Sequence, residues 1–174
     1  MAFSFVVETG DADPDATSYC TVEFADDYIE ANIHASADWL ALEEEDKQRL
    51  LVRASRYLDR QVKWEGERVD GDSGLRWPRA GVYDVDNFLI AENCIPEVLC
   101  EATAELASYL MDDDWTRQES GRGLKEVRID VIEAKFDTDK ASRGSLPQNI
   151  VAMLDGLGQV NTGRRPGFKK IVRH

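Results

Sequence analysis

The segment from Lys47 to Arg60 constrains the fold more than any other part of this 174-residue chain. Its apolar residues recur at the spacing of one helix face, and they are Leu50, Leu51, Ala54, Tyr57 and Leu58. Its arginines lie largely off that stripe, and they are Arg49, Arg53, Arg56 and Arg60. The acidic run at 43–46 suits a helix start, where negative charge meets the positive end of the helix dipole. The pattern predicts a long amphipathic helix.

Three further helices are predicted from apolar spacing and from residues that favour helix ends. The first covers about 22–33 and follows Thr21, whose hydroxyl can accept a free backbone N–H at the helix start. Another begins near Pro96, because proline fits the first turn of a helix. A last, short helix begins near Pro147. Between the first helix and the long one, the sequence predicts a single turn that buries Trp39.

The remaining segments are less periodic. Residues 64–94 contain four glycines and Pro78, but Trp64 and Trp77 make them too apolar for a free linker. We expect an ordered excursion anchored by its tryptophans. Residues 2–7 predict a short strand. Residues 124–137 alternate between apolar and charged side chains with a slip of one, which predicts a bulged strand or a hairpin arm.

Together these elements predict a mainly α fold: a small helical bundle with a β-hairpin or strand excursion and extended terminal arms. One domain is expected, because a chain of this length buries roughly 70% of its unfolded surface. The helical body would cover residues 1–157, including an N-terminal strand or arm at 1–20 and the β arm at about 124–137. Residues 158–174 would form an extended, basic C-terminal arm.

The net charge of −13 is unevenly distributed along the chain. Thirteen acids precede Lys47, the first Lys or Arg, whereas residues 47–157 hold 21 acids and 16 bases. Residues 158–174 hold five bases and no acid. Double-stranded DNA is therefore a poor partner for the body, because binding phosphates needs many Lys and Arg on one face.

Several classes of protein are not expected. The three cysteines form no CxxC pair and the two histidines stand apart, which favours reduced thiols in the cytosol over disulfides or a zinc site. No apolar run is long enough for a membrane span, and residues 1–7 lack the basic start of a signal peptide. Nucleophile–base pairs, glycine-rich phosphate loops and EF-hands are missing. We expect no enzyme, metal or cofactor.

Two clusters could bind a single strand of nucleic acid. Such a binding site needs a basic groove interleaved with exposed aromatic side chains. One is the Arg-Trp-Arg cluster within residues 75–79, and the other is the C-terminal group Arg165, Phe168, Lys169 and Lys170. Against both stands the acidic body, because residues 1–157 carry 34 acids and 16 bases.

The basic C-terminus has two interpretations. It could simply offset the acidic body. Alternatively, it is an arm that docks in an acidic groove of a partner or of a neighbouring copy, with Phe168 as the anchor and Arg164 and Arg165 paired with carboxylates. The candidate partner-binding residues are Arg164, Arg165, Phe168, Lys169, Lys170 and Arg173.

An ordered set of short motifs resembles a known family over residues 5–155. The set comprises Val7-Glu8-Thr9-Gly10, Thr17-Ser18-Tyr19, Ala25-Asp26-Asp27-Tyr28, Arg53-Ala54-Ser55-Arg56-Tyr57-Leu58-Asp59, Trp64-Glu65-Gly66, Leu75-Arg76-Trp77-Pro78-Arg79-Ala80-Gly81-Val82, Ile95-Pro96 and Glu105-Leu106-Ala107. It is similar to the head–tail connector, or adaptor, proteins of tailed bacteriophages. Related sequences carry the label of DnaT-like single-stranded-DNA-binding proteins. The resemblance implies a helical domain that forms a ring of twelve copies beneath the portal, with no catalytic residues.

The leading functional prediction is therefore a structural virion protein that joins the portal to the tail. Its expected partners are the portal protein, a tail or nozzle/neck protein, further copies of itself, and passing double-stranded DNA without specific binding. Its expected location is the neck of the virion, after synthesis in the host cytoplasm. The alternative is a DnaT-like single-stranded-DNA-binding replication accessory protein. A third hypothesis is a phage-encoded module that blocks a host protein through its acidic surface.

Overall fold

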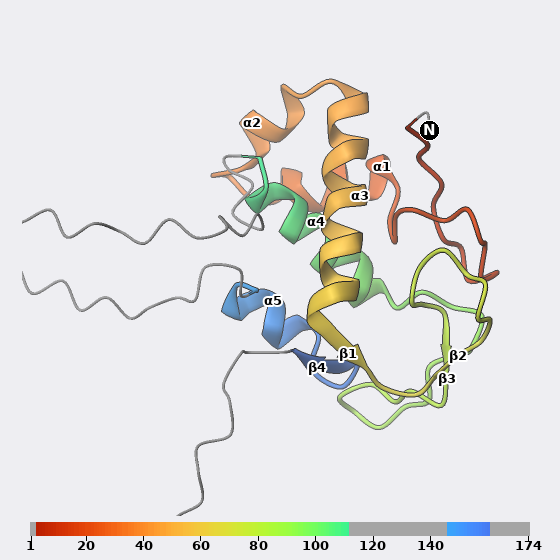
Figure 1. Cartoon of the computed structure of the whole chain (residues 1–174). Helices are drawn as coiled ribbons and strands as arrows, with labels where there is room; N and C mark the ends of the chain where they lie inside the picture. Colours follow the sequence, from red (N-terminus) through yellow and green to blue (C-terminus); the bar gives the residue numbers. More distant parts are fainter. Residues whose placement is uncertain (1–2, 112–145, 161–174) are drawn as a thin grey trace, which may run out of the picture.

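The computed structural model describes residues 3–111 and 146–160, which form a mainly α fold with short strands (Figure 1). The helices are α1 (Val22–Glu30), α2 (Ser36–Leu40), α3 (Glu44–Gln61), α4 (Glu97–Tyr109) and α5 (Gln148–Met153). The strands are β1 (Val62–Trp64), β2 (Glu67–Arg68), β3 (Arg79–Ala80) and β4 (Gly158–Val160). The predicted fold class, a small helical bundle with a β excursion, is confirmed.

The helix α3 is the longest element, with 18 residues, and it packs against α1 and α4. Its apolar stripe is buried as predicted, with Leu51, Ala54 and Leu58 fully inaccessible to solvent. Apolar contact along this stripe fixes how α3 is rotated about its axis. The side chains on its opposite face are therefore held toward solvent.

The predicted helix starts and the Trp39 turn are confirmed, whereas the first helix ends at Glu30 and not near residue 33. The hydroxyl of Thr21 accepts a hydrogen bond from the backbone N–H of Phe24, 3.1 Å away, and so caps α1. Trp39 on α2 is completely buried, and its indole Nε1 donates to Asp26 at 2.7 Å. Pro96 and Pro147 are the residues directly before α4 and α5, where a missing N–H costs nothing.

The segment from 64 to 94 is ordered around its two tryptophans, as predicted. Trp64 and Trp77 are buried and meet edge to face, with ring centroids 6.1 Å apart. β2 and β3 pair as a short antiparallel ladder inside this segment. Further along, Phe88 and Leu89 stay exposed. The excursion therefore packs onto the helices through its first half.

β1 continues directly from the end of α3 and pairs with β4 in antiparallel register, so that Val62 faces Val160. Gly158 packs closely here, because an added Cβ would lie 2.6 Å from a methyl group of Val62. The sequence places the start of the C-terminal arm at this glycine. In the structure, the folded body continues through Val160.

The N-terminal segment is not the strand that the sequence predicts. Only one isolated bridge forms among its described residues, between Val7 and Ser18. Val6 pairs with the neighbouring segment irregularly, because its N–H donates to the side-chain hydroxyl of Thr17 and not to a backbone carbonyl. Beyond it, buried Glu8 accepts backbone N–H groups of Gly10, Ala12 and Asp13 at 2.9 to 3.0 Å, so the chain turns into a loop there.

The predicted β arm at about 124–137 lies outside the described residues. Among the helices of residues 3–111 and 146–160, none is both long enough and apolar enough to cross a membrane.

Candidate functional site

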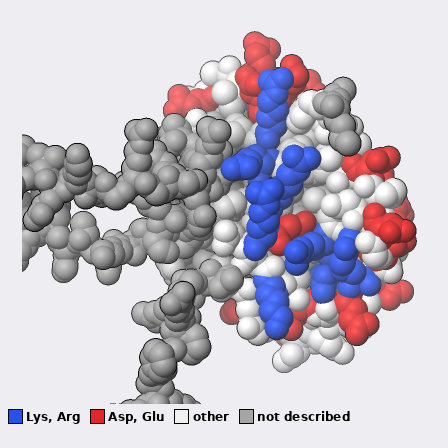
Figure 2. All heavy atoms as spheres, in the orientation of Figure 1, with Lys and Arg blue, Asp and Glu red and all other residues white. Residues whose placement is uncertain are grey.

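Four exposed cationic side chains gather on the solvent face of α3 and the chain beside it. Arg56 and Arg60 are one turn apart on α3, Lys63 lies on β1, and Arg76 lies on the loop between β2 and β3. We call these four residues the basic band. Figure 2 shows Lys and Arg running down this face over α3, with Asp and Glu mostly toward its edges. Side chains four apart on a helix lie side by side, so Arg56 and Arg60 present neighbouring charges.

The side chains of the basic band form no ion pair within residues 3–111 and 146–160, although Asp59 attracts Arg76 at longer range. In this part of the chain, none of the four has a carboxylate within ion-pair distance. By contrast, Arg49 at the start of α3 pairs with Glu45 at 2.6 Å and with Asp46 at 2.7 Å. Lys47 pairs with Asp26 at 2.9 Å. These four charges therefore give this face of the described residues a locally positive character.

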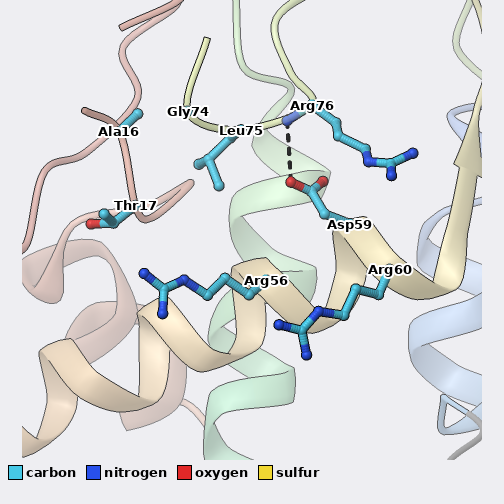
Figure 3. Close-up of a pocket in the computed structure, with 8 residues that line it drawn as sticks. All are labelled: Ala16, Thr17, Arg56, Asp59, Arg60, Gly74, Leu75 and Arg76. Atoms are coloured by element: carbon cyan, nitrogen blue, oxygen red, sulfur yellow. Dashed lines mark hydrogen bonds between the residues drawn. The ribbon is translucent and has the colours of Figure 1, made fainter. Parts of the chain in front are cut away.

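Asp59 fixes the loop that carries Arg76 against α3. One carboxylate oxygen accepts the hydroxyl of Tyr19 at 2.5 Å and the indole N–H of Trp64 at 3.0 Å. The other accepts the backbone N–H of Arg76 at 3.1 Å (Figure 3). Burial raises the pKa of the Asp59 carboxyl above its ordinary value, while these three donors lower it in part. The carboxylate thus links three separate segments of the chain at the centre of the basic band.

A hollow of about 310 Å³ opens beside Asp59. It is lined by Ala16, Thr17, Arg56, Asp59, Arg60, Gly74, Leu75 and Arg76. In Figure 3, Arg56 and Arg60 extend from α3 on one side of the carboxylate, and Arg76 extends away from it on the other side. The hollow therefore combines a fixed carboxylate and an apolar wall with arginines at its edges.

Glycine at position 74 allows two walls of this hollow to meet. An added Cβ would lie 2.5 Å from the carbonyl oxygen of Ala16 and 2.8 Å from that of Pro14, and both atoms belong to backbone. The N–H of Gly74 also donates to the carbonyl of Asp13 at 2.9 Å. The N-terminal loop and the loop after β2 are in direct backbone contact here.

A second hollow, of about 470 Å³, lies between α1 and α4. Its lining residues are Asp27, Tyr28, Ala31, Asn32, Ile33 and Glu105. No Lys or Arg among the described residues lines it, so it does not suit an anionic ligand.

The Arg-Trp-Arg cluster predicted from residues 75–79 is only partly available. Arg76 is exposed, but Trp77 is completely buried and cannot stack on a base. Arg79 is buried too, and its guanidinium donates to the backbone carbonyls of Glu65, Gly66 and Arg76. Trp77 and Arg79 therefore hold the loop in place, and Arg76 alone faces solvent.

An exposed aromatic side chain does lie at the start of α3. The ring of Phe3 is 44% exposed and stands 5.6 Å from the guanidinium carbon of Arg49. The sequence gives no sign of this contact, because the two residues are far apart in the chain. The arginines of α3, however, were visible in the sequence as charges off an apolar stripe.

The candidate partner-binding residues of the C-terminal arm lie outside the described residues. They are Arg164, Arg165, Phe168, Lys169, Lys170 and Arg173. Within residues 3–111 and 146–160, no three His, Cys, Asp or Glu side chains are grouped so that they could hold a metal ion.

We compared the chain with curated proteins, solved structures and models of protein families. No curated protein and no solved structure has a significant match to the chain. A family model described as "Putative DnaT-like ssDNA binding protein" matches residues 3–174.

This match overturns the leading prediction of a head-to-tail adaptor and agrees with its alternative. The prediction weighed the whole-chain charge against nucleic acid, but net charge does not reveal a local cluster of cations such as the basic band. The predicted portal, tail and ring partners, the virion location and the absence of an enzymatic activity stay untested. With all but its first two residues matched, the chain belongs to the family of DnaT-like ssDNA-binding proteins.

Proposed function

We propose that this protein binds single-stranded DNA through the basic band. The observation that carries the proposal is the gathering of four exposed cations, without carboxylate partners among the described residues, on one face of a chain with net charge −13. Unpaired cations on an acidic protein leave a local site for an anion, and the family match supports a nucleic acid as that anion.

Phosphate contacts of this kind predict a specific salt dependence. Each phosphate that a protein neutralises on a single strand contributes about −0.7 to the slope of log K against log salt. If all four side chains of the basic band contact phosphates, they contribute roughly −3 to that slope. Arg56 and Arg60 can each form two parallel hydrogen bonds to one phosphate, which lysine cannot do.

The arrangement favours a single strand over a duplex. A single strand is narrow enough to follow the basic band, and its bases are free to stack on an exposed ring such as Phe3. A duplex would bring its second row of phosphates toward the acidic edges of the same face (Figure 2). Like charges would then oppose binding.

The test is fluorescence anisotropy of a labelled single-stranded oligonucleotide titrated with the full chain at several salt concentrations. The variant is Arg56→Gln with Arg60→Gln, which removes two charges of the basic band. We expect affinity to fall by roughly tenfold or more and the salt slope to become shallower by about 1.4.

Arg49→Gln is the matched control, because Arg49 also lies on α3 but is already paired with Glu45 and Asp46. Its affinity should stay within about twofold of the wild type, since it gives up little free charge. Equal losses in both variants would show that only overall charge matters. No measurable binding by the wild-type chain would refute the function.

A further inference from the structure

We infer that the hollow beside Asp59 receives one base of the bound strand and prefers a base with an amino group over thymine or uracil. The inference rests on the proposed function and adds a selectivity to it. It starts from the lining of the hollow, where a carboxylate stands among the arginines of the basic band.

The carboxylate makes the hollow itself unsuitable for phosphate. Two anions in contact repel each other, and the repulsion grows where water is partly excluded. The phosphates of a strand would therefore rest on the arginines at the edges. Figure 3 shows these arginines on two sides of Asp59, with Arg56 and Arg60 on one and Arg76 on the other. Phosphates held on both sides place the nucleotide between them over the hollow.

Asp59 can accept one more hydrogen bond. A carboxylate offers about four acceptor positions, two on each oxygen. Among residues 3–111 and 146–160, Oδ1 accepts from Tyr19 and Trp64, and Oδ2 accepts from the backbone of Arg76 alone. These three donors also hold the carboxylate in one orientation. A fixed acceptor with one open position selects for a ligand that presents a donor.

The bases differ in whether they present such a donor. Cytosine, adenine and guanine each carry an amino group, and pairing of a carboxylate with the N4 amino group of cytosine is a known mode of base reading. Thymine and uracil offer only an imide N–H, which lies between two carbonyl oxygens. The lone pairs of these oxygens would face the carboxylate and repel it. Leu75 supplies an apolar wall of the hollow for the flat face of the base.

The sharpest comparison uses deoxycytidine and deoxyuridine oligonucleotides, whose bases differ in the group at C4, amino or carbonyl, and in the hydrogen on the neighbouring N3. Anisotropy titrations with wild-type protein at mildly alkaline pH should give roughly tenfold tighter binding to the deoxycytidine strand, because one hydrogen bond to a charged acceptor is at stake. Replacing both hydrogens of the cytosine amino group with methyl groups should lower the affinity to that of the deoxyuridine strand.

Asp59→Asn tests the residue itself. The amide keeps the volume of the side chain but places an N–H₂ group where an acceptor stood, so the preference for deoxycytidine should disappear while binding through the basic band remains. If the variant does not fold, the ligand series on the wild type still decides the matter.

Each result has one meaning. Equal binding of both strands by the wild type overturns the inference but leaves the proposed function intact, provided that Arg56→Gln with Arg60→Gln weakens both. A preference that survives Asp59→Asn also overturns the inference, because another group must then read the base. Failure of both strands to bind refutes the proposed function.

Discussion

The backbone N–H of Arg76 donates a hydrogen bond to Oδ2 of Asp59 across 3.1 Å, and this bond joins the loop after β2 to the last turns of α3. The partner is a backbone group, so the position of Arg76 does not depend on the conformation of its own side chain. The guanidinium remains available for other contacts while the loop beneath it is held. The basic band therefore includes a loop residue placed as firmly as the helical ones.

Removing the Asp59 carboxylate should destabilise the fold. In Asp59→Ala, the buried hydroxyl of Tyr19 and the indole N–H of Trp64 lose their acceptor, and each unsatisfied donor costs about 1–3 kcal/mol. We expect the free energy of unfolding in urea to fall by about 3 kcal/mol. Tyr19→Phe, which removes only one donor, should cost about 1 kcal/mol. Similar losses in both variants would mean that Asp59 does not act through several partners.

The pH dependence of stability should carry the signature of Asp59. Burial raises the pKa of its carboxyl above 3.8 in the folded protein. The folded state therefore binds this proton more tightly than the unfolded state does, so the contribution of Asp59 to stability is greatest at low pH and falls as pH rises through the folded pKa. A carbon-13 titration of the carboxyl by NMR measures this value directly. A midpoint at or below 3.8 contradicts the prediction.

Two glycines of the loop between β2 and β3 should differ in how much their substitution by alanine lowers stability. In Gly74→Ala, the new Cβ would lie 2.5 Å from the carbonyl oxygen of Ala16, so the two backbones must separate. We expect a loss of about 2 kcal/mol or more in thermal or urea unfolding. Gly71→Ala is the matched control, because nothing lies within 4 Å of the added atom. Its stability should stay within about 0.5 kcal/mol of the wild type.

The three thiols should differ sharply in reactivity. Burial raises the pKa of Cys100 to about 12 and that of Cys20 further still, so neither forms appreciable thiolate near neutral pH. Cys94 is exposed. Brief treatment of the native protein with iodoacetamide should label Cys94 alone, as read by peptide mass spectrometry. If the folded Cys94→Ser variant were still labelled, the reaction would involve a buried thiol and would contradict this prediction.

Local patterns in the sequence predict much of the fold. The stripe of apolar residues places α3 correctly, and Thr21 marks the start of α1 because capping involves only neighbouring residues. Tyr109 shows the limit of such patterns. This large apolar side chain ends α4 and is 42% exposed, although Leu110, directly after it, is buried.

The candidate site was less predictable because it depends on contacts between distant residues. Tyr19 and Asp59 are 40 positions apart, and no spacing rule connects them. Within residues 76–79, the sequence cannot say which side chains turn inward, and the structure buries Trp77 and Arg79. Charge sums misled in the same way, because they do not distinguish Arg49, already paired, from Arg60, which has no carboxylate partner among the described residues.

The length of the basic band limits how much of a strand one copy can cover. From Arg56 to Gln61, α3 advances by only about 8 Å, and β1 adds roughly 7 Å up to Lys63. A footprint of about 15 Å accommodates only a few nucleotides, which suggests modest affinity for one copy on one strand. Tight occupancy of long strands would then depend on avidity, with several copies side by side raising the effective concentration of each next contact.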